Sequence, residues 1–369
     1  MALMEVLQDR CEVTLVTGAP FDCARLNRDY HTRVDEHRIA VRVAPMPQIL
    51  RKAQAGDALR GAYIGRFIRR VAKDFDLCIS TYNLAPFGRP AIQFVADFSW
   101  DDEIRYALPQ TVVGVRGLMQ SPSLARSAYI GACKFIDDGE ADLRTHVNNT
   151  VVANSQWTAD LLKSRHNLDS RVIYPPAFSI PFNADAPRTG DFVMLGRITA
   201  DKRILEAIEV LSRVRARGHA FGLHVVGTLD NSAYSARVRA LAAQHGSWVY
   251  LEGGVFGEEK FHLLARHSYA LHMREYEAFG IAVAEQVKMG LIPFIRAQSG
   301  PAEIVDDQRL CFVDLDDAVE VIDRMLRDAR VQRDIRTHLE GRGAMFSQER
   351  FMAESGALIE QHLAGRTLV

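Results

Sequence analysis

Residues 269–305 read YALHMREYEAFGIAVAEQVKMGLIPFIRAQSGPAEIV, and strand and helix signals alternate along this stretch. An apolar run of strand length at 269–273 is followed by a polar loop. Apolar residues at helical spacing then occupy 281–289, and a second short apolar run follows at 292–295. The order strand, loop, helix, strand predicts a crossover unit whose two strands lie parallel in one sheet.

The loop of this unit, EAFG at residues 277–280, has the features of a ligand site. Gly280 can adopt backbone angles that let a ligand approach the chain closely. The helix after it offers free N–H groups and a positive dipole end, which suit a phosphate. Glu277 and Glu285 lie eight positions apart and could address the hydroxyls of one bound molecule, although two glutamates at this spacing also occur by chance. The loop therefore predicts a ligand with anionic and hydroxyl-rich parts.

Length and composition restrict the class of protein. A chain of 369 residues favours two domains, and a net charge of −1 gives no support to nucleic-acid binding. The five cysteines are scattered without a C-x-x-C pair, which predicts buried free thiols in a reducing compartment. The sequence shows no apolar run of membrane-spanning length and no signal-peptide pattern. We therefore expect a cytoplasmic protein, at most peripheral on the inner face of a membrane.

The first half of the chain alternates strands and helices. Strand-like runs occur at residues 11–17, 39–43, 76–80, 91–95, 150–154 and 171–176. This alternation predicts a parallel sheet, with the first run buried. The chain opens in a helix at 1–9, whereas a doubly wound domain normally opens in a strand whose loop lies at the ligand crevice. We expect the N-terminal domain to lack its first strand and the loop after it.

The second half repeats the alternation after an aperiodic, proline-containing stretch at residues 177–190. This predicts one domain at 1–180 and a second domain at 181–345. The tail is helical from 315 to 363, and its last part, 346–369, is expected to cross back to the first domain.

Two helices of the first half carry unusual surfaces. Residues 51–73 hold seven basic side chains against one acidic one, interleaved with apolar residues, and 121–136 is similar but more apolar. Three interpretations are open: contact with anionic lipid, contact with a charged acceptor, and an ordinary solvated basic face.

A second constellation lies in LGRITADKR at residues 195–203. Gly196 ends a predicted strand, Arg197 lies on the turn, and Lys202 begins the next helix. An arginine fork and a lysine charge together can neutralise a diphosphate and the charge that develops when its bond to a leaving group breaks. Taken alone, both side chains could equally be ordinary surface residues.

Three motifs, LGR-x4-K, EAFGIAVAE and SGPAEIV, resemble the nucleotide-sugar half of family 4 retaining glycosyltransferases. The resemblance covers residues 150–363 well and 1–150 by layout only. Two pairs of stretches, VVANSQWTADLL with VIYPP and LHMREYEAFGIAVAE with SGPAEIV, are most similar to the mannosyltransferases that extend lipid-linked oligosaccharides and use GDP-mannose. The resemblance implies an α/β GT-B fold, in which two Rossmann-like doubly wound domains face a cleft. The domain at 1–180 would then be the acceptor-side domain, and the domain at 181–345 would bind the nucleotide sugar.

The resemblance also implies roles for the four charged residues singled out above. Arg197 and Lys202 would bind the donor diphosphate. Glu285 would hydrogen-bond the donor ribose, and Glu277 would face the transferred sugar as a catalytic residue. No side-chain nucleophile is implied, because such enzymes are thought to let the acceptor attack from the front face.

The remaining donor contacts implied by the resemblance come from the backbone. Phe279, Gly280 and Ile281 would touch the sugar and phosphates, and Gly254 and Val255 would border the base. The nucleotide-diphosphate sugar, GDP-mannose in the first place, is then a co-substrate, and neither a cofactor nor a metal is required.

The family often places a histidine after a strand in the middle of the N-terminal domain, where this chain reads QFVADFSWDDE at 93–103. Asp97 is the nearest polar residue and is our catalytic candidate there. Asp101 and Asp102 are alternatives, and all three could be ordinary loop residues.

Two metal-like motifs are set aside. The D-x-D at Asp314 and Asp316 begins a helix, where aspartate is a common N-cap. His262 and His267 flank a predicted helical turn and are expected at the surface rather than on a metal.

The sequence thus predicts a retaining hexosyltransferase, with a nucleotide sugar and a glycan or lipid-linked acceptor as partners. Peripheral contact with an anionic membrane is an open possibility, and no nucleic acid is expected. One alternative is a nucleotide-sugar epimerase on the same fold. Another is an inactive glycan- or partner-binding module, which the missing first strand and Gly-rich loop would explain.

Overall fold

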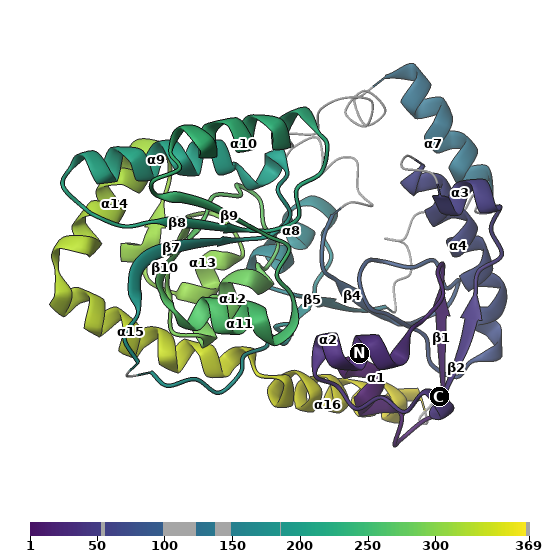
Figure 1. The fold of residues 1–369 in the computed structure, drawn as a ribbon. Helices are drawn as coiled ribbons and strands as arrows, with labels where there is room; N and C mark the ends of the chain where they lie inside the picture. Colours follow the sequence, from purple (N-terminus) through teal and green to yellow (C-terminus); the bar gives the residue numbers. More distant parts are fainter. Residues whose placement is uncertain (53–55, 99–122, 137–148, 185, 367–369) are drawn as a thin grey trace. The chain divides into compact units, whose positions relative to one another are not determined.

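The computed structural model describes residues 1–52, 56–98, 123–136, 149–184 and 186–366. The chain divides into two compact units, Met1–Ile173 with Phe351–Val369 and Tyr174–Arg350 (Figure 1). The boundaries thus fall after residues 173 and 350, where the sequence predicted them after 180 and 345.

The second unit is built on a six-stranded parallel sheet in the order β12-β11-β10-β7-β8-β9. Its strands are β7 Thr189–Leu195, β8 Leu223–Val226, β9 Val249–Gly253, β10 His267–His272, β11 Ile292–Arg296 and β12 Cys311–Phe312. The strand order reverses between β7 and β10, which is where doubly wound sheets bind ligands. The predicted parallel sheet is confirmed.

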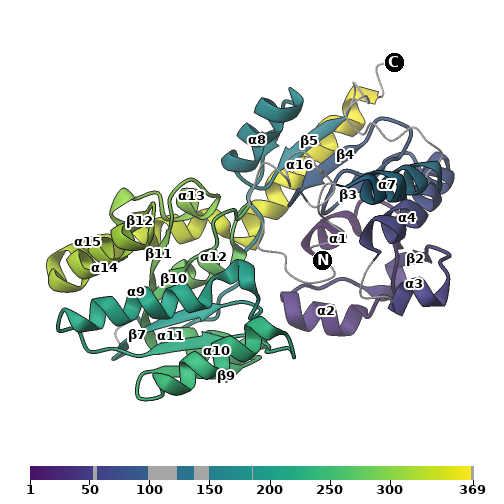
Figure 2. The ribbon, with the colours of Figure 1, turned by 90° about the horizontal axis from the view of Figure 1, so that it is seen from above.

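Helices cover both faces of this sheet. α9 Ile204–Ala216 and α10 Ala233–Gln244 lie on one face, and α11 Gly257–Ala265 and α12 Ile281–Lys288 on the other (Figures 1 and 2). All six residues of β10 are buried, as expected for a central strand with helices on both sides. α13 Pro301–Val305, α14 Leu315–Arg327 and α15 Ala329–Gly343 complete the unit.

The first unit contains two parallel sheets among the described residues, where the sequence predicted one. β1 Val13–Thr17 pairs with β2 Ile39–Val43, while β3 Ile79–Ser80, β4 Ile92–Val95, β5 Thr150–Ala153 and β6 Arg171–Val172 form the second sheet. Among the described residues β1 pairs with β2 alone. The residues of β1 are half-buried, and the prediction of a buried strand there is wrong.

The helices of the first unit include both predicted basic segments. They are α1 Ala2–Leu7, α2 Cys23–Tyr30, α3 Gln48–Lys52, α4 Asp57–Val71, α7 Leu124–Ile136 and α8 Gln156–His166. Ser155 caps α8 by accepting a hydrogen bond from the Thr158 N–H at 2.9 Å, as predicted. Within the described ranges, no helix is both long and apolar enough to cross a membrane. All five cysteines are free, but Cys11 is exposed, so the prediction that all are buried is wrong for that residue.

The helical tail is divided into three helices, the last being α16 Gln348–Arg366. The break after α14 arises at Asp328, whose side chain caps the next helix by accepting from the N–H groups of Arg330 and Val331. From Phe351 onward the tail belongs to the first unit, where Leu358 packs in the same apolar cluster as Leu3 of α1.

Candidate functional site

The carboxyl end of β7 turns sharply at Gly196, which has a φ of +136°. This turn is pressed against the end of β8, because a Cβ added at Gly227 would lie 1.9 Å from the Gly196 carbonyl oxygen. The side chain of Lys202 lies over the same turn, with its Cε 3.4 Å from where a Gly196 Cβ would be. The LGR motif thus forms a bare backbone turn with a lysine above it.

Lys202 and Glu277, predicted from separate motifs, meet between the ends of β7 and β10. The Lys202 Nζ donates to Glu277 Oε2 at 3.1 Å, and Arg274 Nη1 donates to Oε1 at 3.0 Å. Burial opposes ionisation of this carboxyl, but the charges of Lys202 and Arg274 outweigh it and lower the pKa of Glu277 to about 2. Glu277 is therefore a carboxylate at neutral pH and accepts hydrogen bonds only.

His272, the last residue of β10, is a site residue that the sequence analysis missed. Its Nε2 is buried 3.6 Å from Glu277 Oε2 and has no hydrogen-bond partner in the described part of the chain. Burial, with the charge of Lys202, lowers the pKa of His272 to about 4, so the ring is neutral. His272 lines a narrow pocket together with Gly196 and Lys202. In the sequence, His272 stands as a polar residue at the end of an apolar, strand-like run, in LHM. That position could have marked it as a candidate site residue.

The Glu277 loop is held in place by the SGP turn at residues 299–301. The Gly300 N–H donates to the Glu277 carbonyl oxygen at 2.8 Å, and a Cβ on Gly300 would lie 2.0 Å from the Ala278 carbonyl oxygen. Gly280, with a φ of +93°, approaches Pro301 so closely that its Cβ would lie 2.8 Å from the proline Cγ. The two motifs EAFG and SGPAE therefore form one packed unit in which Gly300 has no room for a side chain.

Helix α12 begins directly after this loop and has no side-chain cap. The Phe279 ring is buried against Tyr174 and Phe346, at centroid distances of 5.9 and 5.6 Å, so only its backbone can reach a ligand. Ile281, the first residue of the helix, is half exposed. The Val283 and Ala284 N–H groups donate to the Gly280 carbonyl oxygen, so the N–H groups of Ile281 and Ala282 are the ones that this helix start can offer to an anion.

Glu285 lies inside α12, almost fully buried, and pairs with Lys260 of α11, whose Nζ is 2.7 Å from Oε1. Burial raises the pKa of Glu285, although Lys260 acts in the opposite direction. The two predicted glutamates thus have separate cation partners. Lys260 was not singled out by sequence, because its partner lies 25 positions away.

The other predicted donor residues lie at neighbouring strand ends. Arg197 is exposed after β7, and its side chain makes no hydrogen bond or ion pair with the residues described. Gly254 and Val255 follow β9, and a Cβ on Gly254 would lie 2.8 Å from Thr228 Cγ2. Phe256, the next residue, is 71% exposed and was also missed.

Asp97 lies in the first unit, just after β4. Its carboxylate accepts from the Tyr82 hydroxyl at 2.5 Å and from Asn83 Nδ2 at 2.9 Å. The alternatives Asp101 and Asp102 lie outside the described residues. The catalytic role of Asp97 stays a prediction.

The two rejected motifs have different outcomes. Asp314 caps α14 by accepting from the Asp317 N–H at 2.8 Å, which confirms that interpretation. His262 is exposed, as predicted, but His267 is 5% exposed, so its predicted surface position is wrong. The reason is that β10 begins at His267, two residues earlier than the apolar run indicates.

Part of the chain matches a known protein family. Residues 181–340 match the model of the family described as Glycosyl transferases group 1. A comparison with curated proteins gave no match.

Solved structures align with nearly the whole chain. WaaG, a glycosyltransferase involved in lipopolysaccharide biosynthesis, is 15% identical with a TM-score of 0.68, over 97% of this chain and 94% of its own. Sucrose-phosphate synthase from Thermosynechococcus elongatus is 16% identical with a TM-score of 0.69, over 99% and 92%. Alr3699/HepE from Anabaena, in complex with UDP and glucose, is 16% identical with a TM-score of 0.65, over 99% and 95%.

These likenesses show the α/β fold with parallel sheets of GT-B glycosyltransferases. Together with the family match, they support a glycosyltransferase.

Proposed function

We propose that this protein transfers a hexose, with retention of configuration, from a nucleotide-diphosphate sugar to a glycan or lipid-linked acceptor. The observation that carries the proposal is the Lys202–Glu277 pair at the carboxyl edge of the sheet, beside the uncapped start of α12. GDP-mannose is the proposed donor, and this choice rests on the motif resemblance.

The ion pair between Lys202 and Glu277 is suited to separate when a donor binds. Without a ligand, Lys202 and Glu277 neutralise each other at 3.1 Å, and Arg274 balances the second carboxylate oxygen. A diphosphate would take over Lys202, with Arg197 and the first-turn N–H groups of α12 as further ligands. Glu277 would then be free to accept hydroxyls of the transferred sugar, and the orphaned Nε2 of His272 would gain a polar partner.

The ionisation of Glu277 restricts the chemistry. With a pKa of about 2 it carries no proton to give at neutral pH, so it does not protonate the leaving group. In the proposed step, the bond from the anomeric carbon to the β-phosphate oxygen breaks. The acceptor oxygen bonds to the same face of that carbon, and the acceptor proton passes to the leaving phosphate. Lys202 and Arg197 would stabilise the charge on the departing diphosphate.

The donor base would lie against Gly254 and Val255, with exposed Phe256 as a stacking surface. The HepE structures contain UDP, so uridine and guanosine donors should be tested side by side. At equal concentration, we expect the nucleoside diphosphate with the higher affinity to raise the melting temperature of the protein more, because the ligand binds only the folded state.

The acceptor is proposed to be membrane-associated. Supporting this, α7 carries Leu124 and Phe135, which are 92% and 84% exposed, and it packs against the basic helix α4 through the Tyr129 hydroxyl and the Leu59 N–H. Sedimentation with phosphatidylglycerol vesicles tests this step. Phe135→Ser should weaken binding, while equal binding by wild type and Phe135→Ser would remove the membrane from the proposal.

Calorimetry with the nucleotide diphosphate tests the donor site. Arg197→Ala should weaken binding at least about tenfold, because hydrogen bonds to a charged group contribute about 1.5–3 kcal/mol. Glu285→Gln should weaken it comparably if Glu285 holds the ribose. Arg237→Ala, which removes an exposed arginine of α10, is the matched control and should change nothing. Unchanged affinity in both test variants would end the donor-site assignment.

Product analysis separates the rival activities. A transferase releases the sugar only slowly without acceptor, whereas an epimerase converts the donor without one. A binding module releases no sugar from any nucleotide sugar.

The proposed donor site uses cations of the chain in place of a metal ion. Adding EDTA should therefore leave nucleotide affinity unchanged. A loss that Mg²⁺ or Mn²⁺ restores would contradict this part of the proposal.

A further inference from the structure

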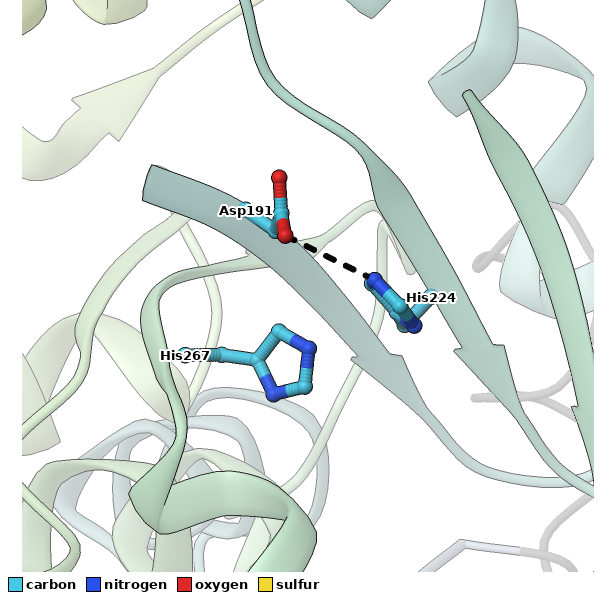
Figure 3. A group of neighbouring side chains, drawn as sticks. All are labelled: Asp191, His224 and His267. Atoms are coloured by element: carbon cyan, nitrogen blue, oxygen red, sulfur yellow. Dashed lines mark ion pairs between the residues drawn. The ribbon is translucent and has the colours of Figure 1, made fainter. Parts of the chain in front are cut away.

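The opposite edge of the same sheet carries a compact group of metal-ligating side chains. Asp191 lies near the start of β7, His224 on β8 and His267 at the start of β10, so they come from three adjacent strands. One ligand atom from each lies within 4.8 Å of the other two, and the histidines flank the aspartate (Figure 3). Asp191 precedes Gly196 by five residues, about 16 Å along an extended strand, so this group is distinct from the donor site.

Both histidines are held in the tautomer that a metal requires. His267 Nδ1 lies 2.7 Å from the Leu263 carbonyl oxygen, which can only accept, so Nδ1 carries the proton and Nε2 keeps its lone pair. His224 Nδ1 lies 2.7 Å from Glu252 Oε1, so Nδ1 donates to that carboxylate, and Nε2 of the neutral ring keeps its lone pair. An imidazole whose second nitrogen donates to a carboxylate or a carbonyl is the usual arrangement around protein-bound zinc.

The direct contact inside the group is weak. His224 Nε2 and Asp191 Oδ2 are 3.7 Å apart, which is too long for a hydrogen bond. The other oxygen, Oδ1, accepts from the Gly222 N–H at 2.5 Å, which fixes the orientation of the carboxylate. The three groups therefore surround a point without satisfying one another.

We propose that this cluster binds a divalent transition metal of the zinc class, through Nε2 of His224, Nε2 of His267 and Oδ2 of Asp191. Two imidazoles and one carboxylate suit Zn²⁺ rather than Mg²⁺ or Ca²⁺, which prefer oxygen ligands. Ligands at zinc bond lengths lie roughly 3.4 Å apart in a tetrahedron, so a pair at the 4.8 Å limit needs to close by about 1.4 Å. Water or an external ligand would fill the fourth position.

From its location, this metal would stabilise the fold, and its fourth coordination position would be open to a ligand from solution. It would tie together the amino ends of the three central strands whose other ends carry the donor site. Asp191 and His224 are 23% and 19% exposed at the side chain, so the site is open to solvent for metal entry and a fourth ligand. A metal bound only by the folded state would raise the melting temperature.

The test uses the full chain, stripped with EDTA, dialysed and titrated with Zn²⁺ by calorimetry and with Co²⁺ by visible absorption. We expect one equivalent to bind, with the intense visible bands of a four-coordinate Co²⁺ site. His224→Gln and Asp191→Asn should each weaken binding at least about 100-fold, and Glu252→Gln about tenfold through the orientation of His224. His262→Gln, at an exposed histidine nearby, should bind as wild type does.

Two results would overturn the proposal. One is the absence of saturable binding at micromolar Zn²⁺, which would make the group an ion-pair network of Asp191, His224 and Glu252. The other is equal affinity in wild type and His224→Gln. His267→Gln is a third ligand variant, but His267 is buried, so this variant could misfold. The variants of the partly exposed ligands His224 and Asp191 therefore provide the decisive test. Failure here leaves nucleotide binding untouched, and failure of the donor site leaves metal binding untouched.

Discussion

The two ends of strand β10 carry buried histidines in opposite electrostatic settings. His267 at the amino end lies beside one carboxylate, that of Asp191 on the next strand. His272 at the carboxyl end faces Lys202 and Arg274, with Glu277 held between those cations. One strand thus presents a cation-binding edge and an anion-binding edge about 16 Å apart, at about 3.3 Å per residue.

The difference follows from what each edge offers in its backbone. At the carboxyl edge, glycines open the turns and an uncapped helix adds N–H groups, so cationic side chains there strengthen an existing attraction for anions. At the amino edge, the Leu263 carbonyl oxygen near the end of α11 accepts from His267 Nδ1, which leaves the lone pair of Nε2 for a metal ion. The same residue type is therefore our proposed metal ligand at one end and a buried neutral ring at the other.

The largest effect that would sharpen this contrast is expected for Glu277→Gln. The variant keeps the shape but removes the charge between Lys202 and Arg274, so kcat/KM for sugar transfer should fall by about 10²–10³-fold. Initial rates with saturating acceptor measure this change. Glu258→Gln, an exposed glutamate of α11, serves as the control. Full activity of Glu277→Gln would remove this residue from the reaction.

Gly300→Ala should damage the carboxyl edge and spare the amino edge. The new Cβ would lie 2.0 Å from the Ala278 carbonyl oxygen, so the loop has to move, at a destabilisation of about 1–3 kcal/mol. Urea unfolding measures the free energy, and calorimetry should show weaker nucleotide binding with unchanged Zn²⁺ binding. Gly341→Ala, where a Cβ meets nothing within 4 Å in a helix, should instead stabilise by about 0.5–1 kcal/mol. Equal stability of the two variants would contradict the packing of the SGP turn.

Acidification should reveal His272 as a buried neutral ring. Its pKa is lowered from 6.5 to about 4, with Lys202, Arg274, Glu277 and Asp201 facing it. Between pH 6.5 and pH 4 the imidazole binds a proton in the unfolded chain but stays neutral in the folded protein. The contribution of His272 to the free energy of unfolding is therefore full above pH 6.5 and is lost as the pH falls toward 4. The loss between pH 7 and pH 5 should be about 2 kcal/mol from this group.

Urea unfolding of wild type and His272→Gln at pH 7 and pH 5 measures that contribution. The variant should lose less stability on acidification, while His262→Gln should follow wild type. Glu277 does not interfere, because its lowered pKa affects stability only below about pH 4.5. Parallel behaviour of wild type and His272→Gln would mean that His272 titrates normally.

The parts of this site that are formed by residues close together in the sequence could be predicted. A buried strand, a glycine and a following helix are neighbours in sequence, so the turns at Gly196 and Gly280 could be located, as could the cap at Asp314. The convergence of Lys202 and Glu277 followed from the rule that parallel strands share a carboxyl edge.

The parts that depend on strand order could not be found. Asp191, His224 and His267 lie 33 and 43 positions apart, and only the order β10-β7-β8 makes them neighbours. Lys260 is similarly separated from Glu285. The mistaken surface position of His267 came from reading a strand start as a helix end, because the two polar residues His267 and Ser268 before an apolar run fit both.

The smallest expected effect tests whether the two edges are independent. A metal that binds at the amino edge changes nucleotide affinity only if the donor site differs between the metal-free and metal-bound protein, and the effect is reciprocal. The described contacts join Lys202 and Glu277 to each other, Arg274 and His272, and none reaches Asp191 or His224. We therefore expect Zn²⁺ to change the Kd for the nucleotide diphosphate by less than about twofold, and His224→Gln to do the same. Calorimetric titration of the nucleotide with and without Zn²⁺ measures the coupling. A change of tenfold or more would mean that β7 transmits strain between its ends, and the two edges would then have to be treated as one site.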